Sequence, residues 1–223
     1  MKNTKYEGYE QTGITVDLVI FTVSDEKLNV LLVKRASEPF SGYWSIPGGF
    51  LREGESLEAA AQRVMEEKTG VKEVYLEQLY TFGEPDRDPR ARIITVTYFA
   101  LIPWEKLAQP RSNKVMDVGW FWVEDLPVLA FDHNQILSFA VSRLRSKAGY
   151  SSIVYGLLPE HFRLSELQRM YEIIMSERFD KRNFRKRMLA SGLLHETGRK
   201  ELTGAHRPAM LYQFKKRELV FFD

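Results

Sequence analysis

Two apolar runs near the N-terminus predict a β-hairpin. Residues 14–23 (ITVDLVIFTV) and 27–36 (KLNVLLVKRA) are rich in β-branched and aliphatic side chains, and the polar residues 24–26 separate them as a short turn. Runs of the same kind recur further along the chain, at residues 74–82, 92–102 and 118–126. We therefore expect a sheet of several strands in the first part of the chain.

The stretch after the hairpin has helical spacing instead. Leu57, Ala60 and Val64 recur at intervals of three and four residues, so they would form one apolar face of a helix. Ser56 is a typical N-cap residue, and Gly70 is a typical residue just after a helix end. This pattern predicts a helix over about residues 57–69.

A second helix is expected at about residues 133–147, after the last strand run. The pattern then lapses between residues 149 and 159, where we place a linker. We predict two domains, residues 1–150 and residues 151–223. Because strands alternate with helices in the first of them, its predicted fold is mixed α/β.

The region after the linker has a helical pattern of its own. Leu167, Tyr171 and Ile174 form an apolar stripe, and Ser165 with Gln168 predicts the start of a helix as a capping box. This helix is the first element of the second domain.

A second, shorter helix follows over residues 181–191. Asp180 can cap its start, Phe184 and Met188 form its apolar pair, and Gly192 ends it. Two strand-like runs, LLHET and AMLYQF, come next around a loop that contains glycine. Two helices followed by a β-hairpin resemble a small winged helix-turn-helix domain.

Composition narrows the class of protein. With 223 residues, of which 44% are hydrophobic, the chain can bury one good core and a small second one. The absence of cysteine excludes disulfides, thiolate metal sites and cysteine nucleophiles, and it fits a reducing compartment. The polar N-terminus and the short apolar runs predict a cytoplasmic protein with no membrane partner.

Charge is distributed unevenly between the two predicted domains. Residues 1–150 contain 18 Lys and Arg against 21 Asp and Glu, whereas residues 151–223 contain 14 against 9. The second domain is therefore basic, which favours a polyanionic partner. A charged surface that only meets solvent is the alternative interpretation of this excess.

The cations of the second domain gather on its second helix and on the loop between its strands. A basic helix fits the major groove of DNA, where lysines and arginines neutralise phosphates and residues near the helix start meet base edges. We predict a double-stranded DNA operator as partner; an oligomerisation module with a charged outer face is the alternative. The predicted DNA-binding residues are Lys181, Arg182, Asn183, Arg185, Lys186, Arg187, Arg199, Lys200 and Arg207.

The first predicted helix lies within a stretch that resembles the signature of the Nudix hydrolases. Gly49, Glu55, Arg63, Glu67 and Gly70 are in register with the glycine, glutamate and arginine positions of that family's loop-helix-loop motif. The resemblance implies a Nudix-type α/β/α sandwich with a mixed sheet. In that family, glutamates on the helix hold divalent metal against a pyrophosphate.

Two substitutions within this motif count against metal-dependent catalysis. Positions 64, 67 and 68 are three and four residues apart, so we expect them on one helix face. The residues at these positions are Val64, Glu67 and Lys68. The face therefore has a single carboxylate, and a cation stands where the metal-binding family has another carboxylate. We predict no catalytic residues, no required cofactor and at most weak Mg²⁺ binding at Glu55 and Glu67.

Residues 82–102 (FGEPDRDPRARIITVTYFALI) resemble the branch of the Nudix family that acts on ADP-ribose. Arginines in this segment would supply fixed positive charge for phosphate oxygens, and Phe82 or Tyr98 would pack on a base or ribose. Solvated loop charges, and a capping or surface histidine at position 133, are the alternatives. The predicted effector-binding residues are Arg35, Phe82, Arg87, Arg90, Arg92 and His133.

A Nudix-like domain followed by a basic winged helix resembles the Nudix-related transcriptional regulators known as the NrtR family. The resemblance covers nearly the whole chain and includes the stretch DKRNFRKR at residues 180–187. It implies a homodimeric repressor of genes for NAD metabolism that ADP-ribose or a related nucleotide releases from its operator. A sugar-responsive regulator of the same type and an active ADP-ribose pyrophosphatase are the alternatives.

Overall fold

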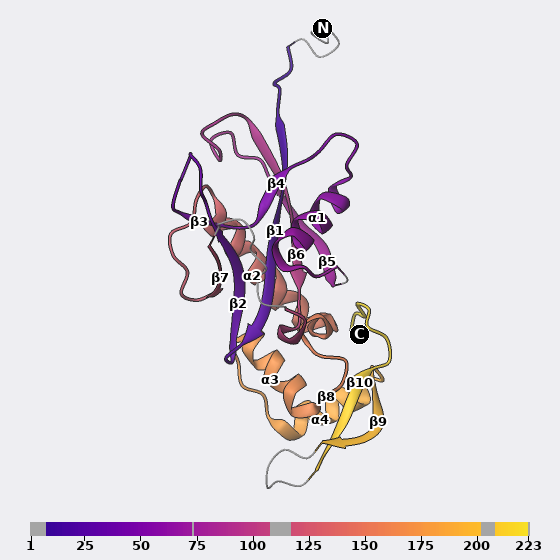
Figure 1. The fold of residues 1–223 in the computed structure, drawn as a ribbon. Coiled ribbons are helices and arrows are strands. Elements are labelled where there is room, and N and C mark those ends of the chain that lie inside the picture. The colour runs from indigo at the N-terminus through magenta and orange to yellow at the C-terminus, as the bar shows by residue number, and fades with distance from the viewer. Residues whose placement is uncertain (1–7, 73, 108–116, 202–207, 223) are drawn as a thin grey trace.

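The computed structural model describes residues 8–72, 74–107, 117–201 and 208–222 (Figure 1). Its strands are β1 (Gly13–Ser24), β2 (Lys27–Lys34), β3 (Trp44–Ser45), β4 (Gly48–Phe50), β5 (Tyr75–Phe82), β6 (Ile93–Leu101), β7 (Val118–Trp122), β8 (Phe162–Arg163), β9 (Leu194–Glu201) and β10 (Ala209–Phe214). Its α-helices are α1 (Leu57–Thr69), α2 (His133–Tyr150), α3 (Leu164–Met175) and α4 (Lys181–Ala190), and Trp104–Lys106 and Ile153–Leu157 form 3-10 helices. None of the helices within the described ranges is long and apolar enough to cross a membrane.

A mixed sheet of seven strands forms the first half of the molecule. Its order is β3-β2-β1-β6-β5, with β4 added to β1 and β7 added to β2, and β1 runs parallel to β6. The side chains of successive β1 residues point to opposite faces of the sheet. Leu18 and Ile20 pack in the cluster under α1, while Val19 and Phe21 pack in the cluster under α2. The predicted α/β/α sandwich is therefore confirmed.

The ends of α1 lie where the sequence predicts them. The Ser56 hydroxyl accepts a hydrogen bond from the backbone N–H of Ala59 at 3.1 Å. Gly70 adopts a left-handed conformation with φ of 73°, and its N–H donates to the Glu66 carbonyl at 2.9 Å. A side chain at position 70 would strain this turn, which is why glycine ends the helix.

Two short strands were not predicted. β3 and β4 lie in a segment whose proline and glycine residues are typical of a loop, and Pro47 lies between the two strands. Pairing with longer neighbours nevertheless holds both in the sheet, because β3 adds to β2 and Gly48 of β4 lies opposite Asp17 of β1. This pairing brings the start of the Nudix-like motif against the middle of the sheet.

The segment predicted to be a linker between the domains is packed into the core. Residues 151–158 are largely buried, and Ile153 and Val154 are fully buried in the same apolar cluster as α2 and α3. The guanidinium of Arg217 also donates to the carbonyls of Tyr155, Leu158 and Pro159. The connection is therefore a packed element, and the predicted boundary after residue 150 stays a prediction because both halves share one core.

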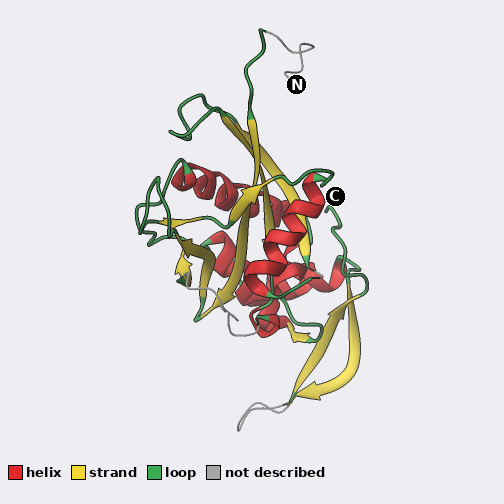
Figure 2. Ribbon diagram, turned by 45° about the horizontal axis from the view of Figure 1, so that its top comes forward, coloured by secondary structure: helices red, strands yellow, loops and turns green. Residues whose placement is uncertain are grey.

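The second half has the predicted winged-helix elements. β8, β10 and β9 form a three-stranded sheet beside α3 and α4, and the β9–β10 pair projects from the body (Figure 2). One expectation was wrong: Ser165 does not cap α3. The helix begins at Leu164, and the Glu166 carboxylate accepts from the backbone N–H of Arg163 at 2.7 Å, because pairing of β8 fixes the chain up to Arg163.

Candidate functional site

A cavity of about 230 Å³ opens where the start of β1, the loop after β2, strand β4 and the loops before β6 and α2 meet. Among the predicted effector-binding residues, Arg35, Arg87, Arg90 and His133 line it. Phe131 also lines it, and the residues of its wall that the sequence did not single out include Thr15, Asp17, Phe50 and Asp88. We call this cavity the Arg/Asp pocket.

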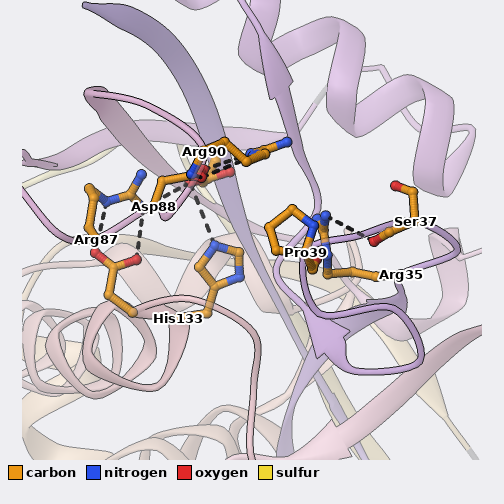
Figure 3. A network of polar contacts seen from close by, with 9 residues as sticks. Arg35, Ser37, Pro39, Arg87, Asp88, Arg90 and His133 are labelled. Atoms are coloured by element: carbon orange, nitrogen blue, oxygen red, sulfur yellow. Dashed lines mark hydrogen bonds and ion pairs between the residues drawn. The ribbon is translucent and has the colours of Figure 1, made fainter.

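Arg87 is held by two carboxylates beneath the pocket. Its Nε and Nη2 donate to the two oxygens of Asp132 at 2.8 and 2.7 Å, and Nη2 lies 3.7 Å from Asp17 (Figure 3). The Arg87 side chain is only 3% exposed. A buried bidentate pair of this kind fixes the arginine in one orientation. Arg87 thus ties β1 to the residue that precedes α2.

Arg90 is the more exposed of the two loop arginines. It donates from Nε and Nη2 to Asp88 at 2.9 and 2.6 Å. Burial alone would raise the pKa of Asp88, but the hydrogen bonds from Arg90 outweigh it and lower that pKa. The pair places a fixed carboxylate and a fixed guanidinium side by side in the wall, where both can bind polar groups of a ligand.

Phe131 separates two of the pocket's cations. Its ring centre lies 4.7 Å from the Arg35 guanidinium and 5.4 Å from that of Arg90. Burial and the nearby Arg90 lower the pKa of Arg35. The backbone of Phe131 has φ of 55°, a left-handed conformation that a bulky residue rarely adopts and that costs on the order of 1–3 kcal/mol. Such strain at a pocket wall is typical of a functional position.

His133 is buried and neutral at the floor of the pocket. Its Nδ1 accepts a hydrogen bond from the backbone N–H of Ile46 at 3.0 Å, so the ring proton sits on Nε2, which lies 3.9 Å from Asp17. Burial lowers the pKa of His133 below its ordinary value. The sequence left open the alternative that His133 is a surface or capping residue. Its burial shows that this alternative is wrong.

Acidification is expected to destabilise the fold through His133. The folded state keeps the ring neutral, whereas an unfolded chain binds a proton below the ordinary pKa of 6.5. Stability from this group is therefore present above pH 6.5 and is lost as the pH falls from 6.5 toward the lowered pKa. Urea midpoints across this window should fall more for the wild type than for His133→Gln. Equal pH dependence of both proteins would contradict this role.

Phe82, Arg92 and Tyr98 do not lie in the wall of the pocket. Phe82 is 8% exposed and packs against the rings of Tyr80 and Phe139. Arg92 donates to the carbonyl of Gly83 at 2.6 Å. Tyr98 is 3% exposed under α1. The sequence shows the types of Phe82 and Tyr98 but not the strand face, and an inward position in β5 or β6 turns these two side chains into the core. Arg92 lies just before β6 and is half-buried.

The Nudix-like motif is organised around Arg63. Its Nε and Nη2 donate to the two oxygens of Glu55 at 2.6 and 2.9 Å, and its Nη1 lies 3.7 Å from Glu67. The hydrogen bonds from Arg63 and from the backbone of Arg52 lower the pKa of Glu55 to about 2. Arg52 also pairs with Glu67 at 3.3 Å. Both candidate metal ligands are therefore engaged by arginines.

The helix face that holds positions 64, 67 and 68 is only partly exposed. The Val64 side chain is 1% exposed and packs in the cluster between α1 and the sheet. Glu67 is exposed and Lys68 is partly buried. Within the described residues, no three His, Asp or Glu side chains form a group that could hold a metal ion. The residues present do not fit the metal cluster that the motif implies.

The second candidate site is the surface of α4. Asp180 caps the helix by accepting from the backbone N–H of Asn183 at 2.8 Å, and Phe184 and Met188 anchor it in the core. Its predicted DNA-binding residues are all exposed, namely Lys181, Arg182, Asn183, Arg185, Lys186 and Arg187. Arg199 and Lys200 are exposed on β9, and Arg207 lies outside the described residues.

The fold and the two sites define a DNA-binding regulator in which a small-molecule pocket is joined to a winged helix. Family models match both parts: the NUDIX domain over residues 12–139 and the NrtR DNA-binding winged helix domain over residues 154–214. The chain belongs to the NrtR family of Nudix-related transcriptional regulators.

Three relatives illustrate the range of this similarity. The ADPR responsive transcriptional repressor NtrR of Acinetobacter baylyi is 40% identical over 217 residues, or 96% of this chain and 86% of that protein. The structure of Shewanella oneidensis NrtR with a 27mer DNA has a TM-score of 0.83 and 41% identity, and the match covers 91% of this chain and 93% of that one. Its NUDIX domain with ADP ribose gives a TM-score of 0.55 at 41% identity, covering 65% and 99%. An ADP-ribose pyrophosphatase of Methanocaldococcus jannaschii is 35% identical over 134 residues, or 60% of this chain and 75% of that protein.

Proposed function

We propose that this chain is a transcriptional repressor of genes for NAD metabolism, released from its operator by ADP-ribose or a related nucleotide. The observation that carries the proposal is the pairing of the Arg/Asp pocket with a helix α4 whose exposed positions carry five cations and no acid. The names of the Acinetobacter and Shewanella relatives support both the DNA and the ADP-ribose part. Such a protein acts in the cytoplasm, with the chromosome.

The chemistry of the Arg/Asp pocket suits a phosphorylated sugar. Asp17 and Asp88 are carboxylates that accept hydrogen bonds from sugar hydroxyls, while the guanidinium groups of Arg35 and Arg90 suit phosphate oxygens. A cavity of about 230 Å³ is smaller than the ~300–1,000 Å³ of pockets that enclose a whole small ligand. The pocket therefore takes one end of the effector, and the rest lies across its open mouth.

The deciding experiment is a gel shift on the DNA immediately upstream of the protein's own coding sequence. Titration with ADP-ribose is expected to release the DNA, while NAD and pentoses at equal concentration should have less effect. Release by a pentose alone would indicate the sugar-responsive alternative. A shift that is equal with and without each compound would show that the effector part of the proposal is wrong.

We propose further that the Nudix domain binds ADP-ribose without hydrolysing it and needs no metal. The buried Val64, the cation Lys68 and the arginine-bound Glu55 support this, because they leave no carboxylate cluster for Mg²⁺. ADP-ribose should bind equally well with Mg²⁺ and with EDTA, as measured by calorimetry. Turnover of ADP-ribose with Mg²⁺ or Mn²⁺ in the usual enzyme range of ~1 to 10³ s⁻¹ would favour the pyrophosphatase alternative.

A homodimer is the proposed assembly, because regulators with one winged helix per chain commonly bind two half-sites. Light scattering should give twice the chain mass of 26.0 kDa. A mass of one chain at the concentrations used for DNA binding would contradict this.

Two elements connect the pocket to the winged helix. β1 carries Asp17 in the pocket wall, and at the tip of the β1–β2 hairpin Glu26 pairs with Arg169 of α3 at 2.7 Å. α2 begins at His133 in the pocket, and its Arg145 donates to the Ile174 carbonyl at the end of α3 at 3.0 Å. Figure 1 shows the hairpin tip beside α3. We propose that effector binding shifts α3 and α4 through these contacts.

Arg145→Ala is expected to weaken the coupling between the two sites. It removes the hydrogen bonds to Ile174 and to the Ser176 hydroxyl, so the ratio of DNA affinities without and with ADP-ribose should fall several-fold, within the ~1–3 kcal/mol typical of allosteric coupling. Arg143→Ala is the matched control, because Arg143 is on the same helix but stacks on Phe139. Equal ratios for wild type and Arg145→Ala would contradict the proposed route.

A further inference from the structure

Helix α4 presents one face directly away from the protein core. Phe184 and Met188 mark its buried side, with 7% and 3% exposure. At about 100° per residue, the exposed residues between roughly 120° and 180° from the middle of that side are Arg182, Asn183, Lys186, Leu189 and Ala190. Leu189 is 42% exposed. The outward face therefore carries two cations, the side-chain amide of Asn183, the small Ala190 and one large apolar side chain, Leu189.

The remaining cations of α4 flank this face. The Arg187 guanidinium lies 5.7 Å from the ring centre of Phe222, in the C-terminal segment of the chain. Lys181 and Arg185 line the space between α3, α4 and β10, together with Tyr212. These three side chains are directed toward other parts of the protein, so the residues free to enter a groove head-on are those of the outward face.

The charge of this face favours DNA as its partner, yet its one large aliphatic side chain, Leu189, is apolar. Arg182 and Leu189 are seven residues apart, or about 10.5 Å along a helix that rises ~1.5 Å per residue. That length matches about three base-pair steps of ~3.4 Å each. In the major groove, the apolar group that a leucine can contact is the C5-methyl of thymine. A protein partner would instead have to cover a single leucine that is surrounded by cations.

We infer that Leu189 is a specificity-determining residue that recognises a thymine through its methyl group. Arg182 and Lys186 hold the same face of the helix in the groove by contacts to phosphates or purine edges. Burying one leucine against one methyl group favours thymine over an otherwise identical base without the methyl by about fourfold. This inference rests on the proposed role in DNA binding.

The test uses the upstream DNA in two forms, one with thymine and one with uracil at every thymine position, since uracil lacks only the methyl group. Wild-type full-length protein should bind the thymine duplex at least about fourfold more tightly, the gain expected for one buried methyl. Leu189→Ala should bring the thymine-to-uracil ratio close to one. Single uracil substitutions should then locate the effect at one thymine in each half-site.

Lys186→Ala is the matched control on the same face. It should weaken binding to both duplexes and leave the ratio unchanged, because a lysine does not sense the methyl group. Leu189 is exposed and alanine favours helix, so the variant should keep the wild-type melting curve. An equal thymine-to-uracil ratio for wild type and Leu189→Ala would overturn the inference. So would a change of oligomeric mass in Leu189→Ala, which would place the leucine in a protein interface. A wild-type chain that binds neither duplex would overturn the proposed function as well.

Discussion

Gly48→Ala is expected to weaken ADP-ribose binding at least about tenfold, or ~1.4 kcal/mol. A Cβ at this position would lie 1.9 Å from the Asp17 carboxylate and 3.0 Å from the Val16 carbonyl. Because the Val16 carbonyl is backbone, the Asp17 side chain has to turn away. When the Asp17 side chain turns away, it loses its contacts with Arg87 and His133, both of which line the pocket.

Gly49→Ala is the matched control for this prediction. Its Cβ would meet only the Arg63 guanidinium, at an ordinary contact distance of 3.9 Å. Calorimetry should therefore give nearly wild-type ADP-ribose affinity for Gly49→Ala and a large loss for Gly48→Ala. Urea unfolding should show about 1–3 kcal/mol lower stability for Gly48→Ala, the usual cost of overpacking. Similar affinities for both variants would show that Asp17 does not shape the binding site.

Local patterns were sufficient for the elements that surround these residues. The helix α1 and its caps depend on contacts a few positions apart, such as Ser56 to Ala59, and periodicity captures them. The core of α4 is equally local, because Phe184 and Met188 are one turn apart. β3 and β4 could not be predicted, since both are stabilised by pairing with distant strands.

The pocket was predicted only in part because its contacts are distant in sequence. Arg87 meets Asp132 across 45 residues, and His133 meets Ile46 across 87. One further signal in the sequence points to the pocket: Asp17 interrupts an otherwise apolar strand, and Thr15 precedes it on the same face. A carboxylate in the middle of a buried strand costs stability unless it has a partner, so it indicates a functional position.

The face of α1 shows where a periodicity argument fails. Positions 64, 67 and 68 share about a third of a helix circumference, with position 64 between the other two, and their spacing alone does not say which part of that arc faces the core. Val64 is buried, whereas Glu67 on one side of it is exposed and Lys68 on the other side is partly buried. An apolar residue at position 64 therefore packs inward, and restoring a carboxylate there would bury a charge unless a cation came with it.

Replacing Arg182 and Lys186 together by alanine is expected to weaken DNA binding at least about tenfold near physiological salt and to flatten its salt dependence. Each lost phosphate contact should lower the slope of log affinity against log salt by roughly 0.9. Both residues are exposed on the outward side of α4, so the fold and the ADP-ribose affinity should not change. Fluorescence anisotropy at several salt concentrations measures the affinity and the slope.

Arg187→Ala separates a general loss of charge from loss at the DNA surface. Arg187 is on the same helix, but its guanidinium lies over Phe222 of the C-terminal segment. Its removal should therefore change the salt slope less than removal of either outward cation. If all three substitutions have the same effect, α4 acts as a diffuse basic surface and not as an oriented reading helix. If none changes DNA affinity, α4 is an oligomerisation element, and the excess of cations in the second domain serves an interface between chains.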